Sequence, residues 1–146
     1  MFSGSIPAIP TPFRDDRIDE AALRDHVAWL IEQGSSGLVA CGTTGEAASL
    51  SQSEHSRIID ICVFEANGKV PVIAGCGSSN TAAALELVHR AKDCGAAAAM
   101  VMAPCYVRPD QRGIAGHFED LAMHGGLPMV LYNCLLYTSD AADEGL

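Results

Sequence analysis

The stretch Gly37-Leu38-Val39-Ala40-Cys41-Gly42-Thr43-Thr44-Gly45-Glu46 joins a short apolar run to a turn bounded by glycines. The apolar run, residues 37–41, is typical of a strand that is buried on both faces, as in a parallel sheet. Ser51-Gln52-Ser53-Glu54 follows as a capping box, which predicts the start of a helix. The stretch therefore predicts one strand–turn–helix unit of an α/β protein.

The same unit recurs along the chain at intervals of about 30 residues. Strands are predicted at Ser5–Ile9, Gly37–Cys41, Val70–Gly75, Ala98–Ala103 and Pro128–Tyr132. The helices between them are predicted to begin at Asp19, Ser51, Asn80 or Thr81, and Asp110, and the last two to end at Gly95 and Gly125-Gly126. This alternation predicts parallel strands joined by right-handed crossovers.

Two architectures have this alternation, an open doubly wound sheet and a (β/α)8 TIM barrel. A complete barrel takes about 250 residues. The 146 residues of this chain would then form a truncated barrel of about five strands and four helices. Strand spacing alone leaves both architectures open, because doubly wound units have similar lengths. In a truncated barrel we expect Val39, Ile73 and Val130 to lack the contacts that close the interior.

Composition limits the kinds of partner. The formal net charge is −9, which disfavours binding to nucleic acid and to anionic membranes. The longest apolar run, Ala96–Ala103, is too short to cross a bilayer, and no basic residue precedes Arg14 as a secretory signal would require. We therefore expect a soluble, cytoplasmic protein.

Cysteines and histidines give no metal-site signature. The six cysteines form no C-x-x-C pair, and no two histidines have ligand spacing, so we expect no metal site. Most of the cysteines stand in apolar stretches and are expected to be buried thiols. The five histidines fall mostly on predicted helices, where half-exposed positions are expected.

Hydroxyl groups follow three of the predicted strands. Thr43 and Thr44 follow the strand at 37–41, Tyr106 follows the strand at 98–103, and Tyr132 ends the last strand. Parallel strands bring these groups to one rim. A hydroxyl both donates and accepts hydrogen bonds, so such a set can pass a proton, and the glycine-bounded turn can hold a small carboxylate. An ordinary strand-to-helix turn with amphipathic tyrosines explains the same residues.

The stretch Gly75-Cys76-Gly77-Ser78-Ser79-Asn80 is an imperfect dinucleotide fingerprint. Asn80 replaces its third glycine, and no acid follows the next predicted strand. It keeps open a non-catalytic nucleotide- or metabolite-binding α/β module as an alternative.

Five motifs together resemble the dihydrodipicolinate synthase family of pyruvate-dependent class I aldolases. They run in order over residues 1–133: Gly4-Ser5-Ile6 with Thr11-Pro12-Phe13, the turn at 42–46, Val70–Gly75, Tyr106 with Arg108-Pro109, and Leu127–Asn133. The resemblance implies a (β/α)8 barrel without a cofactor. It also implies condensation of pyruvate with aspartate semialdehyde through a lysine Schiff base, in lysine (diaminopimelate) biosynthesis, by a homotetramer. Another pyruvate aldolase, N-acetylneuraminate lyase, shares part of the pattern and is the alternative enzyme.

The resemblance also assigns roles to the rim residues. Thr44 would bind the pyruvate carboxylate, and Thr43, Tyr106 and Tyr132 would form a proton relay in which Tyr106 reaches a neighbouring subunit's site. The likeness stops after Asn133, so residues 134–146 are interpreted as a foreign or frameshifted tail. Neither Lys69 nor Lys92 stands at the predicted rim, so we expect the chain to lack the Schiff-base lysine.

Overall fold

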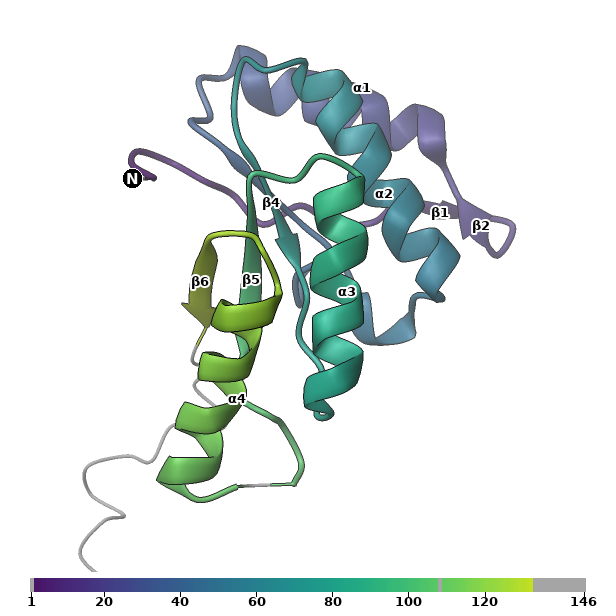
Figure 1. Cartoon of the computed structure of the whole chain (residues 1–146). Coiled ribbons are helices and arrows are strands. Elements are labelled where there is room, and N and C mark those ends of the chain that lie inside the picture. The colour runs from purple at the N-terminus through teal and green to yellow at the C-terminus, as the bar shows by residue number, and fades with distance from the viewer. Residues whose placement is uncertain (1, 108, 133–146) are drawn as a thin grey trace, which may run out of the picture.

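The computed structural model describes residues 2–107 and 109–132 (Figure 1). Four strands form a parallel sheet in the order β3-β4-β5-β6: β3 (Leu38–Ala40), β4 (Val72–Gly75), β5 (Ala98–Met102) and β6 (Met129–Tyr132). The helices are α1 (Glu20–Glu32), α2 (Gln52–Ala66), α3 (Thr81–Asp93) and α4 (Gln111–His124), with a short 3-10 helix η1 (Ala47–Ser49) after β3. The predicted order of strands and helices is confirmed from residue 37 onward.

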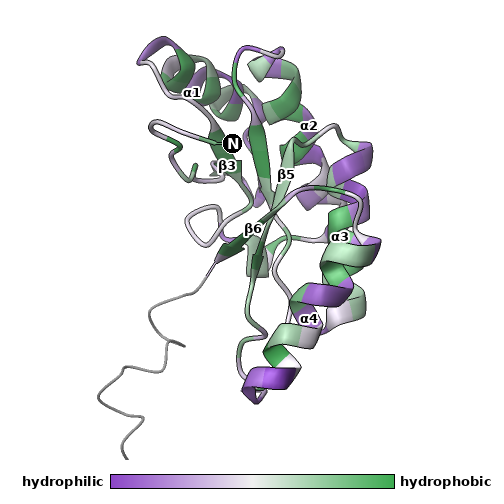
Figure 2. Cartoon of the chain, turned by 60° about the vertical axis from the view of Figure 1, so that its left-hand side comes forward, coloured by the Kyte–Doolittle hydropathy of each residue, from purple (hydrophilic) through white to green (hydrophobic). Residues whose placement is uncertain are grey.

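Successive strand residues alternate between two apolar layers. Leu38 and Ala40 of β3 pack into the larger core between the sheet and the helices. Val39, between them, faces a second cluster that contains no helical residue. Figure 2 shows the apolar strands beside helices whose outward faces are polar. Burial on both faces explains why the strands are continuous apolar runs rather than alternating ones.

The inner face of the sheet is better covered than the sequence led us to expect. Val39 is 8% exposed and Ile73 is 3% exposed, so the expectation that both lack covering contacts is wrong. Ile6 and Met100 pack against this inner cluster. Val130 is half-buried on the last strand of the sheet.

The segment Ser5–Ile9 does not form the regular strand that was predicted. It runs beside β3, where Val39 donates its N–H to the carbonyl of Pro7 (2.9 Å) and accepts from Ile9 (3.0 Å). The ladder is reduced to one parallel bridge, between Ala8 and Val39. Proline has no N–H to donate, so Pro7 interrupts the pairing.

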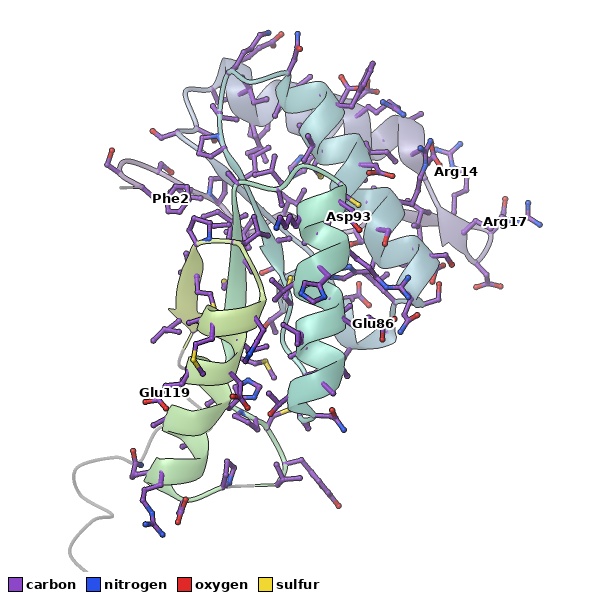
Figure 3. The ribbon with its side chains drawn as sticks, in the orientation of Figure 1. Phe2, Arg14, Arg17, Glu86, Asp93 and Glu119 are labelled. Atoms are coloured by element: carbon purple, nitrogen blue, oxygen red, sulfur yellow. The ribbon has the colours of Figure 1, made fainter. Side chains whose placement is uncertain are left out.

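A two-stranded hairpin that the sequence analysis missed precedes α1. β1 (Phe13–Arg14) pairs with β2 (Arg17–Ile18) in antiparallel fashion. Asp15 and Asp16 between them have φ values of 50° and 58°, as a type I′ turn requires, and aspartate tolerates this region better than most residues. Figure 3 shows Arg14 and Arg17 on this hairpin, at the edge of the molecule away from β6.

The predicted helix starts are confirmed by their caps. Asp19, Asn80 and Asp110 each accept a hydrogen bond from a backbone N–H in the first turn, and Ser51 forms the full capping box with Glu54. Each cap satisfies amides that the first helical turn leaves free. No helix in the described residues is long and apolar enough to cross a membrane.

Two histidines are buried, which corrects the expectation of half-exposed positions. His55 and His117 are each 3% exposed. Each has one ring nitrogen bonded, the Nε2 of His55 to the Gly75 carbonyl (2.7 Å) and the Nδ1 of His117 to the Thr81 hydroxyl (2.9 Å). The other ring nitrogen of each has no partner. Burial lowers the pKa of both histidines below the ordinary value.

The cysteines behave as buried thiols, as predicted for most of them. Cys41, Cys62 and Cys76 are buried, and the cysteines of the described residues form no disulfide. Burial raises the pKa of Cys62 and of Cys76 to about 12. These thiols are therefore protonated at neutral pH and unsuited to act as nucleophiles.

The buried histidines predict that acid destabilises the fold. The unfolded chain binds protons near pH 6.5, whereas folded His55 and His117 resist protonation until a lower pH. The free energy of unfolding should therefore fall as the pH drops from about 6.5 to 5. Urea unfolding at a series of pH values measures this. His117→Gln should make the free energy of unfolding less dependent on pH. His89→Gln is the control, because His89 is exposed, and it should leave the dependence unchanged. The same dependence on pH in the wild type and in both variants would contradict the prediction.

Candidate functional site

A cavity of about 570 Å³ opens at the carboxyl ends of the strands. Cys41 and Gly42 follow β3, Gly75 ends β4, Met102 ends β5 and Tyr132 ends β6, and all five line the cavity. Parallel pairing brings these strand ends together: Ala40 pairs with Ala74, Gly75 with Met100, and Met102 with Tyr132. The cavity lies where ligands bind in both architectures considered from the sequence.

The turn after β3 supplies one wall of the cavity. It begins at Cys41 and ends at Glu46, and both have φ values near 55°, a left-handed conformation that is rare outside glycine. Backbone hydrogen bonds from Gly45 to Gly42 (3.1 Å) and from Glu46 to Thr43 (3.1 Å) close the turn. Held in this way, the turn places Thr43 on the cavity wall.

The close approach of β3 and β4 requires a glycine at position 75. A Cβ atom on Gly75 would overlap the carbonyl oxygen of Cys41. His55 joins the same strand ends from α2, because its Nε2 donates to the Gly75 carbonyl and its own carbonyl accepts from the Cys41 thiol (3.7 Å). A carbonyl can only accept, so the His55 proton lies on Nε2.

The structure brings together two of the four predicted site residues. Thr43 and Tyr132 both line the cavity. Thr44 is exposed on the same turn but does not contribute to the lining. Tyr106 is 91% exposed, has a left-handed φ of 68°, and also lies outside the lining.

Other lining residues were not among the predicted site residues. They come from the turn and η1 after β3, from the loop after β4, and from β5 and the loop after it: Glu46, Ala47, Ala48, Ser49, Gly77, Ser78, Ser79, Met100 and Cys105. Their position in the chain gave a usable signal, because loops after parallel strands meet at one edge of the sheet. Ser79 donates to the Cys105 carbonyl (2.8 Å), which ties the loop after β4 to the loop after β5.

The cavity offers hydroxyls and amides rather than an amine or a metal site. Thr43, Ser49, Ser78, Ser79 and Tyr132 carry hydroxyls, and Glu46 is the charged side chain of the lining. Among residues 2–107 and 109–132, no group of three side chains could hold a metal ion. The arrangement can bind a small oxygen-rich molecule and move protons between hydroxyls.

Comparison with known proteins relates the chain to one family of enzymes. The model of the dihydrodipicolinate synthetase family matches residues 1–140. The 4-hydroxy-tetrahydrodipicolinate synthase of Novosphingobium aromaticivorans is 60% identical over 133 residues, which are 91% of this chain and 45% of that protein. The enzyme of the same name from Erythrobacter litoralis is 55% identical over 145 residues, which are 99% of this chain and 50% of that protein.

Solved structures of dihydrodipicolinate synthases also match the chain. A crystal structure of dihydrodipicolinate synthase superimposes with a TM-score of 0.91 at 45% identity and covers 95% of this chain and 48% of that one. The chloride-inhibited synthase from Acinetobacter baumannii, complexed with pyruvate, gives 0.90 at 44% identity, covering 92% and 46%. The chain thus spans about half the length of the relatives it matches. This likeness confirms the predicted truncated (β/α)8 barrel over the open doubly wound sheet. The predicted boundary at 133 and the tail at 134–146 lie outside the described residues.

The packing at Gly75 predicts that an added methyl group there disrupts the site. Gly75→Ala should lower the free energy of unfolding by about 2–3 kcal/mol, because backbone rather than a flexible side chain must move. Gly116→Ala on α4 is the matched control, since a Cβ there meets nothing within 4 Å. It should be neutral or add up to about 1 kcal/mol through helix propensity. Chemical denaturation measures both, and equal stabilities for the two variants would contradict the prediction.

Proposed function

Since this chain belongs to the dihydrodipicolinate synthetase family, we propose that the complete protein is a lyase-type synthase of lysine biosynthesis. It condenses pyruvate with aspartate semialdehyde through a lysine Schiff base, in the cytoplasm and without a cofactor. The observation that supports this best is the convergence of Thr43 and Tyr132, from strand ends far apart in the sequence, on one cavity.

In this proposal Thr43 and Tyr132 carry protons. Both residues line the same cavity, Thr43 from the turn after β3 and Tyr132 from the end of β6. A hydroxyl that accepts a proton on one lone pair can release its own proton to the next group, so no net charge needs to be stored inside the cavity. In the condensation a proton leaves the methyl carbon of the pyruvate imine, and a proton reaches the aldehyde oxygen as the carbon–carbon bond forms; these are the transfers that such a relay assists.

Thr44 is proposed to bind the carboxylate of pyruvate. It follows Thr43 in the turn after β3, and the backbone amides of that turn can donate to the same carboxylate. Ser78 and Ser79 of the lining directly precede Asn80, which caps α3, so the positive end of that helix adjoins the cavity. A helix N-terminus favours a negative charge, which supports an anionic substrate here.

Tyr106 is proposed to act in a neighbouring copy of the protein. Its side chain is almost fully exposed and does not line the cavity of its own chain. Its left-handed backbone holds the side chain outward at some cost in energy. A homotetramer in which Tyr106 completes another subunit's relay explains both features.

The amine that forms the Schiff base is proposed to come from the other half of the protein. Lys92 lies in the last turn of α3, whose first turn adjoins the cavity, so about 17 Å of helix separates the two. Lys69 precedes β4 by three residues, and the cavity is at the far end of that strand. The two threonines in the turn at 42–46, together with relatives named as the synthase, favour this function over N-acetylneuraminate lyase.

A completed barrel tests the proposed reaction. Residues 1–133 are joined to the remaining half of the Novosphingobium aromaticivorans relative, which is 60% identical over the matched part. The product should condense pyruvate with aspartate semialdehyde. Thr43→Val and Tyr132→Phe should each lower kcat by about 100- to 1,000-fold, because each removes one hydroxyl of the relay.

Glu119→Gln serves as the control variant for the completed barrel, because Glu119 lies on the outward face of α4 (Figure 3) and its loss should leave kcat unchanged. Full activity in Thr43→Val, or a completed barrel that folds but accepts no pyruvate, would overturn the proposed function.

Trapping with borohydride tests the source of the amine. A pyruvate imine is reduced to a stable adduct that mass spectrometry locates. The completed barrel should carry this adduct, while the 146-residue chain alone should carry none, because Lys69 and Lys92 lie at the opposite ends of their elements from the cavity. An adduct on either lysine would refute the assignment.

A further inference from the structure

Thr11 is a buried polar residue outside the cavity lining. It is 5% exposed, and its hydroxyl donates to the carbonyl of Gly45 at 2.7 Å. The bond joins residues 34 positions apart in the sequence and is buried. A buried hydrogen bond of this length contributes to stability mainly because neither of its partners could be left unpaired without cost.

The Thr11 bond acts on the turn that carries Thr43. That turn begins and ends in left-handed residues other than glycine, at Cys41 and Glu46, so its conformation is costly when isolated. A costly conformation persists only where surrounding contacts hold it. The Gly45 carbonyl lies between the two left-handed residues, and the hydroxyl of Thr11 holds it from outside the turn.

The segment that carries Thr11 is itself fixed to the sheet. Ile9 donates to the Val39 carbonyl (3.0 Å), and the carbonyl of Pro12 accepts from Asp19 (2.9 Å) at the start of α1. The segment also approaches the turn closely, since a Cβ on Gly45 would lie 3.1 Å from the Ile9 carbonyl oxygen and 3.3 Å from the Thr11 hydroxyl. Thr11 therefore links the turn to a segment whose position is fixed by its pairing with β3.

We propose that Thr11 is a positioning residue of the candidate site. Its hydroxyl, through the Gly45 carbonyl, holds the turn at 41–46 in the conformation that presents Thr43 to the cavity. Thr11 itself does not line the cavity, so it acts on substrate only through the turn. The expected effect of Thr11 on catalysis rests on the proposed function. The expected effect of Thr11 on the conformation of the turn does not.

Hydrogen exchange tests the structural consequence in the 146-residue chain. Thr11→Val keeps the shape of the side chain and removes the donor, and Thr11→Ser keeps the donor. In Thr11→Val the amides of residues 45–47, which close the turn, should exchange about tenfold faster. Amides inside α3 should be unchanged, and Thr11→Ser should return the turn to the wild-type rate.

Exchange that is unaltered in Thr11→Val, or accelerated equally in the turn and in α3, would overturn the proposal. If Thr11→Val does not yield folded protein, the comparison of Thr11→Ser with Thr11→Ala isolates the same hydroxyl in a smaller side chain. The same two results then support or overturn the proposal.

Kinetics of the completed barrel test the catalytic consequence. A loosened turn should raise the KM for pyruvate and lower kcat in Thr11→Val, with both restored in Thr11→Ser. Loss of folded protein alone would lower the active fraction and leave KM unchanged, which would contradict a positioning role. A wild-type barrel without activity would instead count against the proposed function, and hydrogen exchange would still decide the role of Thr11.

Discussion

The site depends on the parallel pairing of four short strands. In a parallel ladder all carboxyl ends point the same way, so the residues that follow β3, β4, β5 and β6 meet at one edge whatever their separation in the sequence. Gly75 makes this pairing tight at the edge, because its missing side chain lets the β3 backbone approach. Thr43 and Tyr132 reach one cavity as a consequence of strand geometry rather than of any direct contact between them.

Strand pairing fixes the floor of the cavity but not the turns above it. Those turns are held by buried side-chain contacts from other elements: Thr11 holds the turn after β3, and His55 ties α2 to the end of β4. Each contact crosses from one element to another and pairs with a backbone carbonyl. A buried polar side chain carries a desolvation penalty that its hydrogen bond to the backbone offsets. Because that bond is lost if the carbonyl moves, each contact resists movement of the backbone that it holds.

The strands from residue 37 onward and the helix starts could be predicted from the sequence, because both are local patterns. An apolar run marks a strand buried on both faces, and Ser51 with Glu54 marks a helix start. The interruption of pairing at Pro7 is also predictable, since proline lacks a donor, but the apolar pattern of Ser5–Ile9 favours a regular strand. The aspartate pair at 15 and 16 was a hairpin signal that lacked the usual glycine.

The burial of individual side chains could not be predicted from the sequence. His55 and His117 stand at ordinary helix positions, and only the packing of α2 and α4 onto their neighbours buries them.

The rim residues show the same limit. Strand topology predicts that Thr43, Thr44, Tyr106 and Tyr132 follow strand ends, but turn conformation decides which of them line the cavity. The left-handed backbone at Tyr106 follows from the path of its loop, which no local pattern encodes.

Strand pairing also explains which parts of the proposed reaction this chain can supply. Hydroxyls at strand ends are positioned by pairing that this chain completes by itself, since β3 to β6 are consecutive neighbours in the sheet. The lining described here contains no lysine, so in the proposed reaction the amine comes from outside it. β6 is the last strand of the described sheet, and its Leu131 is 60% exposed. In the proposed reaction, Thr43 and Tyr132 of the relay therefore belong to this half of the barrel, and the amine belongs to the other half.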